Sequence, residues 1–142
     1  MNKIRAPKKR LRPDSGEALL EMALVLPILI VLSMGMLDFG RAFHAKSVLD
    51  QAAREGARVG VVTVPTFDSA PAVARARVVL AAAGMSAASA SATLDPVSKL
   101  VTVNVTYTFR FVTPGVFTLI GASYGNTITM TGTSTMRLED GT

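Results

Sequence analysis

The chain has 142 residues, which is enough for one small domain beside a membrane-spanning segment. Its net charge of +5 lies entirely within residues 1–15, where six basic residues accompany one acid, while nine basic and nine acidic residues balance in the remainder. No basic stretch remains for a nucleic-acid partner. The chain has no cysteine, which excludes disulfides and thiolate metal sites, and its single histidine, His44, cannot build a multi-histidine metal site. We expect no metal and no cofactor.

A long apolar run follows the basic tail. Residues 22–37 carry no charged side chain, and a helix over residues 18–37 would be about 30 Å long, the hydrocarbon thickness of a bilayer. Because the basic residues come first, we expect residues 18–37 to cross a membrane with the N-terminus on the cytoplasmic side. Pro27 predicts a kink, since proline removes one backbone hydrogen bond. A secretory signal peptide fits poorly, because no Ala-x-Ala cleavage site follows Leu37.

One acid, Glu21, interrupts the apolar character near the N-terminal end of this segment. A carboxylate inside a bilayer is costly, so it is by default the mark of a functional site. The alternative is that Glu21, which lies only about one turn inside the segment, extends its carboxylate to the lipid headgroups.

The helical pattern continues beyond the apolar run. Small or apolar residues recur mostly every three or four positions: Phe39, Ala42, Phe43, Leu49, Ala52, Ala53, Gly56 and Gly60. We expect one helix over residues 17–62, half in lipid and half in water, with an ion pair between Asp50 and Arg54 on its polar side. Four small residues predict close packing against a helix or a sheet, either of the same chain or of another subunit: Ala53, Gly56, Ala57 and Gly60.

Residues 63–142 are expected to form a small α+β domain outside the membrane. Its helix should begin at Ser69, which can cap it, and end before Gly84. Alternation of apolar and polar residues predicts three antiparallel strands, over residues 90–94, 99–111 and 126–138. Pro114-Gly115 predicts a turn, with an apolar connector over residues 116–120. The fold class is α+β, with a long N-terminal transmembrane helix packed on a small antiparallel β-sheet domain.

The sequence shows no hydrolase constellation, no glycine-rich phosphate loop and no paired carboxylates, so we expect no enzymatic activity. The strongest indication of function is instead the junction at Gly16. A basic leader, a glycine and an apolar helix follow one another, and Glu21 is the fifth residue after Gly16. This layout resembles that of type IV prepilins and pseudopilins. A cut after Gly16 would create a cationic α-amine at Glu17, and in a filament such an amine on a neighbouring subunit can neutralise Glu21 and set the axial register.

The wider sequence closely resembles the TadE-like family, over residues 16–27, 38–41 and 52–58 and more loosely at 131–137. The resemblance implies a pilin-like fold and a minor pilin or pseudopilin of the Tad (type IVc) pilus system, a structural part of cell adhesion and secretion. It also implies a leader over residues 1–16 that a prepilin peptidase removes. Gly16 would be the last leader residue, Glu17 the mature N-terminus and Glu21 the recognition and assembly residue.

The implied location is the bacterial inner membrane, crossed once, with residues 63–142 outside and with entry into the pilus left open. The implied partners are the prepilin peptidase, other Tad pilins and pilus assembly proteins. Two alternatives also stay open: an uncleaved, membrane-anchored binding module, and a permanent scaffold of a secretion machine. An intact N-terminus on the mature protein would favour either alternative.

Overall fold

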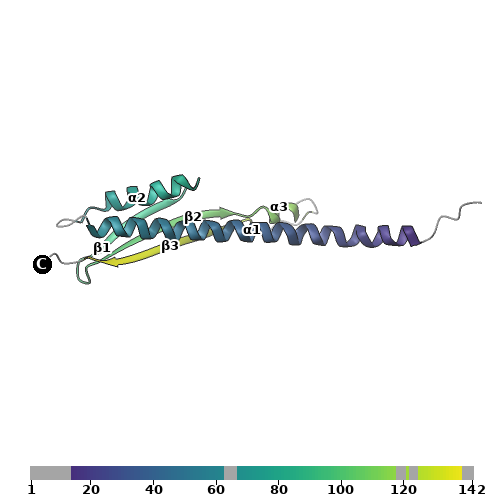
Figure 1. The fold of residues 1–142 in the computed structure, drawn as a ribbon, viewed down its shortest axis with the longest axis horizontal. Coiled ribbons are helices and arrows are strands. Elements are labelled where there is room, and N and C mark those ends of the chain that lie inside the picture. The colour runs from purple at the N-terminus through teal and green to yellow at the C-terminus, as the bar shows by residue number, and fades with distance from the viewer. Residues whose placement is uncertain (1–13, 63–66, 118–120, 122–124, 139–142) are drawn as a thin grey trace, which may run out of the picture.

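The computed structural model describes residues 14–62, 67–117, 121 and 125–138. In chain order the elements are helix α1 (Asp14–Val62), helix α2 (Ser69–Ala82), strands β1 (Ser89–Asp95) and β2 (Leu100–Arg110), the short helix α3 (Thr113–Phe117) and strand β3 (Thr127–Arg137). The three strands form one antiparallel sheet in the order β1-β2-β3. The predicted α+β fold is therefore confirmed, and Figure 1 shows the N-terminal half of α1 projecting away from the folded domain.

Helix α1 is a single helix of 49 residues that begins at Asp14, three residues before the predicted start. It continues through Pro27 without a break, and Figure 1 shows no sharp bend along it. The predicted kink is therefore not seen. One missing backbone hydrogen bond leaves the rest of the helical ladder intact on both sides of the proline.

Helix α2 has a well-formed stop at each end. Its N-cap is Asp68 rather than the predicted Ser69, because the Asp68 carboxylate accepts a hydrogen bond of 2.9 Å from the N–H of Ala70. At the other end Gly84 has a φ of +73°, and the N–H of Met85 donates to the carbonyl of Leu80 at 2.8 Å. This is a Schellman motif, in which the left-handed glycine lets the chain turn back over the last helical carbonyls.

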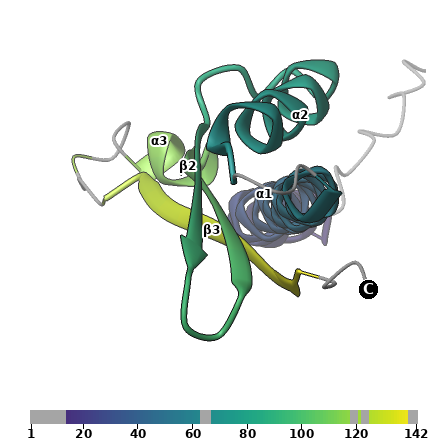
Figure 2. The ribbon, with the colours of Figure 1, turned by 90° about the vertical axis from the view of Figure 1, so that its left-hand side faces the viewer.

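The sheet presents its apolar side to α1 and α2. The alternation predicted for residues 99–111 is confirmed, because Val101, Val103 and Val105 of β2 are fully buried while the residues between them are more exposed. Figure 2 shows α1 end-on, with α2 above it and the strands to its left. The core that these elements share also includes Leu49, Ala52, Ala53, Ala57, Ala72, Ala76, Leu80 and Phe109.

The two strand connections differ in kind. Between β1 and β2 the chain makes a tight turn, where the Ser98 hydroxyl and the N–H of Val97 donate to the carboxylate of Asp95 and hold its pKa below the usual value. Between β2 and β3 the structure has helix α3 where a Pro-Gly turn was predicted. Part of the predicted connector, residues 118–120, lies outside the described residues.

Two predicted features of α1 are wrong. Phe39 and Phe43 follow the spacing of the packed residues but are 74% and 71% exposed, because the face of α1 that packs on the domain at this level contains Asp38, Ala42 and Ala45 instead. Asp50 pairs with Lys46 instead of Arg54, at 2.7 Å. The flexible lysine reaches Asp50 and, at the same time, donates to the carbonyl of Thr131 on β3, a second contact that the sequence of the helix does not reveal.

Among the glycines that the structure describes, Gly132 marks the closest approach of two elements, α1 and β3. A Cβ atom placed on Gly132 would lie 2.5 Å from the backbone carbon of Leu49 and 2.6 Å from its carbonyl oxygen. Both groups are backbone and cannot rotate away. Only glycine therefore lets the helix cross β3 at this separation.

Gly132→Ala should destabilise the full-length protein by about 1–3 kcal/mol or more, because one of the two elements has to shift. The measurement is thermal or denaturant unfolding in detergent. Gly125→Ala is the matched control, since a Cβ there meets nothing within 4 Å. Equal stability of the two variants would contradict the close crossing of α1 and β3.

Candidate functional site

The residues predicted to serve processing and assembly lie in the part of α1 that the rest of the chain leaves uncovered. Gly16, Glu17 and Glu21 are all exposed, and the two glutamates are four residues apart on one side of the helix. Gly16 itself lies in the first turn of α1 rather than in extended backbone. The first helical turn lacks partners for its N–H groups, so local unwinding there is less costly than in the helix interior.

The same half of α1 has the character of a membrane anchor. Its most apolar 18-residue window has a mean hydropathy of 2.3, and none of that window is buried within the chain. The core helix of a water-soluble protein would bury such a surface against its own domain. This helix is long and apolar enough to cross a bilayer, which suggests membrane anchoring.

The four predicted packing residues lie in the other half of α1, inside the folded domain. Ala53 and Ala57 are fully buried, and added Cβ atoms on the two glycines would collide with neighbouring elements. At Gly56 the nearest atom would be the carbonyl oxygen of Ala72 on α2, at 2.9 Å, and at Gly60 it would be Cγ1 of Val101 on β2, also at 2.9 Å. In this structure the small residues bring α1 against its own α2 and β2.

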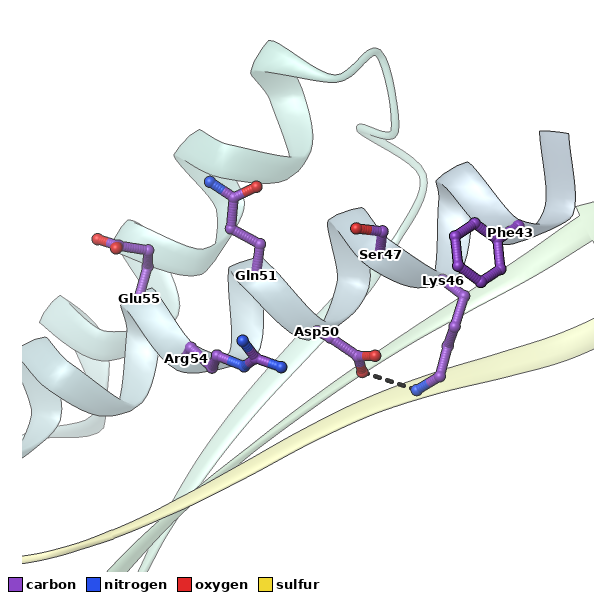
Figure 3. A pocket seen from close by; sticks show the side chains of 7 residues that line it. All are labelled: Phe43, Lys46, Ser47, Asp50, Gln51, Arg54 and Glu55. Atoms are coloured by element: carbon purple, nitrogen blue, oxygen red, sulfur yellow. Dashed lines mark hydrogen bonds and ion pairs between the residues drawn. The ribbon is translucent and has the colours of Figure 1, made fainter. Parts of the chain in front are cut away.

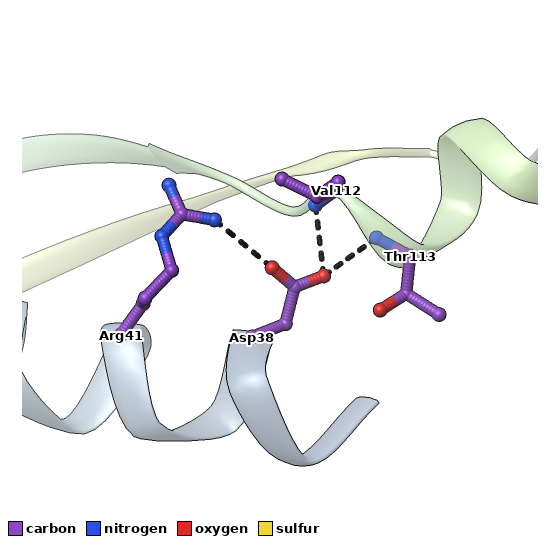
Figure 4. A network of polar contacts seen from close by, with 4 residues as sticks. All are labelled: Asp38, Arg41, Val112 and Thr113. Atoms are coloured by element: carbon purple, nitrogen blue, oxygen red, sulfur yellow. Dashed lines mark hydrogen bonds and ion pairs between the residues drawn. The ribbon is translucent and has the colours of Figure 1, made fainter. Parts of the chain in front are cut away.

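Asp38 is the functional-site residue that the sequence reasoning missed. It directly follows the uncharged run and is only 4% exposed. As Figure 4 shows, its Oδ2 accepts hydrogen bonds from the N–H groups of Val112 at 2.8 Å and Thr113 at 2.6 Å, and its Oδ1 accepts one from Arg41 at 3.0 Å. We call this arrangement the Asp38 clamp. The signal in the sequence was a lone acid at the end of the apolar run with an arginine three residues later.

The carboxylate of Asp38 joins α1 to the start of α3, and Arg41 extends the contact to β2. The guanidinium of Arg41 also lies 5.3 Å from the ring centre of Phe109, so it contacts the end of β2 while it pairs with Asp38. Burial raises the pKa of the Asp38 carboxyl, but the hydrogen bonds from Thr113, Val112 and Arg41 outweigh it and leave the pKa below the ordinary value of 3.8. The clamp therefore stabilises the fold above pH 3.8 and loses its effect as the pH falls through the lowered pKa.

A polar groove of about 510 Å³ follows α1 on the domain side of the clamp (Figure 3). Its lining mixes both charges with one exposed aromatic ring: Phe43, Lys46, Ser47, Asp50, Gln51, Arg54 and Glu55. Glu55 is paired with Arg75 of α2 at 3.1 Å, and Asp50 with Lys46. Within the described part of the chain, no group of three or more His, Asp or Glu side chains is arranged to hold a metal ion.

Asp38→Asn should loosen α3 without unfolding the sheet. The amide keeps the shape of the carboxylate but removes the charge that three donors share, and hydrogen bonds to a charged group contribute about 1.5–3 kcal/mol each. Hydrogen exchange of the Val112 and Thr113 amides should accelerate, while the amides of β2 stay protected. The control is Asp50→Asn, whose exposed ion pair contributes about 1 kcal/mol at most. Unchanged exchange at Val112 and Thr113 in Asp38→Asn would show that the clamp does not hold α3.

Comparison with known proteins identifies the N-terminal part of the chain. Residues 16–58 match the family model described as TadE-like protein. No curated protein and no solved structure matches the chain significantly. The matched segment contains Gly16, Glu21, the Asp38–Arg41 pair and the packing glycine Gly56. The predicted resemblance is confirmed for residues 16–58, whereas the looser resemblance at 131–137 lies outside the match. The TadE-like segment supports an association of the protein with the Tad pilus system.

Proposed function

We propose that this protein is a minor pilin or pseudopilin of the Tad system, a structural component without catalysis of its own. The observation that carries the proposal is the division of α1 into two halves. One half is apolar and uncovered, and begins with Gly16 and Glu21; the other is the spine of the folded domain. A helix of this kind can leave the bilayer and pack against equivalent helices without unfolding its own domain.

Three segments of the chain have separate roles in this function. Residues 1–16 are a leader that a prepilin peptidase removes, and with it the whole net charge of +5. Residues 17–62 are the helical spine, of which residues 18–37 cross the inner membrane. Residues 63–142 complete the domain outside the membrane. The positive tail before the span supports this orientation, because basic residues are retained on the cytoplasmic side.

Glu21 is proposed to act in assembly. A carboxylate that moves from the headgroup region into a bundle of apolar helices loses its hydration and needs a lasting partner. The α-amine released at Glu17 of a neighbouring subunit supplies such a partner. Within its own chain the Glu21 side chain is exposed, so it is accessible to a second subunit.

Intact-mass measurement of the protein from membranes that contain the peptidase tests both steps. The wild-type chain should have lost 16 residues, with Glu17 as its first residue. Glu21→Gln keeps the size and polarity of the side chain but removes its charge, so it should be processed and inserted like the wild type and yet fail to enter or support pili. Glu55→Gln, which removes a partly exposed acid paired with Arg75 in the domain half of α1, is the control and should support normal piliation.

Two results would overturn parts of this proposal. Only full-length protein in cells with an active peptidase would favour an uncleaved anchored binding module or a permanent scaffold. Normal piliation by Glu21→Gln would show that Glu21 has no role in assembly and that its carboxylate only extends to the lipid headgroups.

A further inference from the structure

Helix α3 lies beside the apolar half of α1, at the end of the folded domain nearest to it (Figure 1). A groove of about 490 Å³ runs between them, and nearly all of its lining is apolar: Val31, Leu32, Gly35, Met36, Phe39 and Thr113. Most of these residues belong to the proposed membrane span, which ends at residue 37. Thr113, the first residue of α3, thus lies beside the last residues of the span along the axis of α1.

The Asp38 clamp fixes α3 at this level. The two N–H groups that donate to Asp38 belong to Val112, just before α3, and to Thr113, its first residue. Since Asp38 follows the last residue of the span, the connection between β2 and β3 is tied to the point where α1 leaves the apolar region. Val31 lies about 9 Å further into the span than its last residue, Leu37, because six residues at about 1.5 Å each separate them along the helix axis.

The chain around the clamp has the composition of a lipid-facing surface. No charged residue occurs between Arg110 and Arg137, so the whole β2–β3 connection is uncharged. Val112, which is bonded to Asp38, is 53% exposed, and Met36, Leu37 and Phe39, next to Asp38 along α1, are exposed as well. Exposed apolar side chains therefore occur on both chain segments that meet at the clamp.

We propose that the start of α3, together with the groove between it and α1, contacts the boundary between headgroups and acyl chains in the outer leaflet of a phospholipid bilayer. The proposal rests on the membrane span proposed above. Interfacial elements typically insert about 5–10 Å into this boundary, and the groove extends to Val31, about 9 Å from the end of the span at Leu37. A bilayer fits better than a separate protein partner, because four of the six residues that line the groove belong to the proposed span itself.

The contact gives the clamp a second task. Because α1 is one continuous helix, the span and the domain move together, and the span alone sets how deep the whole protein lies in the bilayer. With α3 resting on the lipid surface, the domain has two supports, and the peptide groups at the start of α3 have Asp38 as a hydrogen-bond partner in a region where water is scarce.

Nitroxide labels on single cysteines test this proposal, because the natural chain has no cysteine. The full chain is reconstituted in phosphatidylethanolamine and phosphatidylglycerol vesicles with Gly115→Cys in α3, Gly35→Cys in the span or Val97→Cys in the β1–β2 turn. A Cβ at Gly35 or Gly115 meets nothing within 4 Å, and Val97 is 91% exposed, so all three sites accept a label. Collision rates are measured with oxygen, which concentrates in lipid, and with a water-soluble nickel chelate.

The labels at Gly35 and Gly115 should collide preferentially with oxygen, and the label at Val97 with nickel. Adding Asp38→Asn to Gly115→Cys should weaken the oxygen preference at Gly115 and leave that at Gly35 unchanged. A nickel preference at Gly115 beside an oxygen preference at Gly35 would overturn this inference alone. Protection of Gly115 from both reagents would also overturn it, since protein would then cover the site. A nickel preference at Gly35 would overturn the membrane span itself.

Discussion

The close crossing of α1 over the sheet and α2 is the contact on which the rest of the structure depends. At Gly132 of β3 there is no room for a side chain above the backbone of Leu49, and Gly56 and Gly60 of α1 are similarly close to α2 and β2. Backbones at this separation exclude water and let the valines of β2 fill the core. Because the domain is built against the C-terminal half of α1, the N-terminal half remains available for a membrane and for other helices.

Asp38 marks the place where one half gives way to the other. A buried carboxylate is costly unless donors surround it, and here three donors from two elements do so. The result is a polar contact at the end of the domain nearest to the apolar half of α1, where β2 has ended and the fully buried valines of the sheet no longer contribute. The same helix thus uses small residues for close packing inside the domain and one acid for attachment at its edge.

Local periodicity predicted most of the fold, and contacts between distant residues explain what it did not predict. The long helix, the second helix and the three strands were all visible as spacings of three to four or of two residues. The Asp38 clamp was not, because its partners are 74 and 75 residues away along the chain. Gly132 was missed for the same reason. Spacing along α1 allows Asp50 to pair with Lys46 as well as with Arg54, and the contact of Lys46 with Thr131 on β3 is the part that the spacing cannot show.

The position of the domain relative to the membrane tests the account most directly. A phosphatase that is active only outside the cytoplasm, fused after Leu138, should be active in cells, whereas a reporter that works only in the cytoplasm should be inactive at the same position. This result follows if residues 18–37 cross the membrane and the basic tail stays inside. An inactive phosphatase together with an active cytoplasmic reporter would contradict the proposed orientation of the span, and with it the cytoplasmic leader and the pilin-like function.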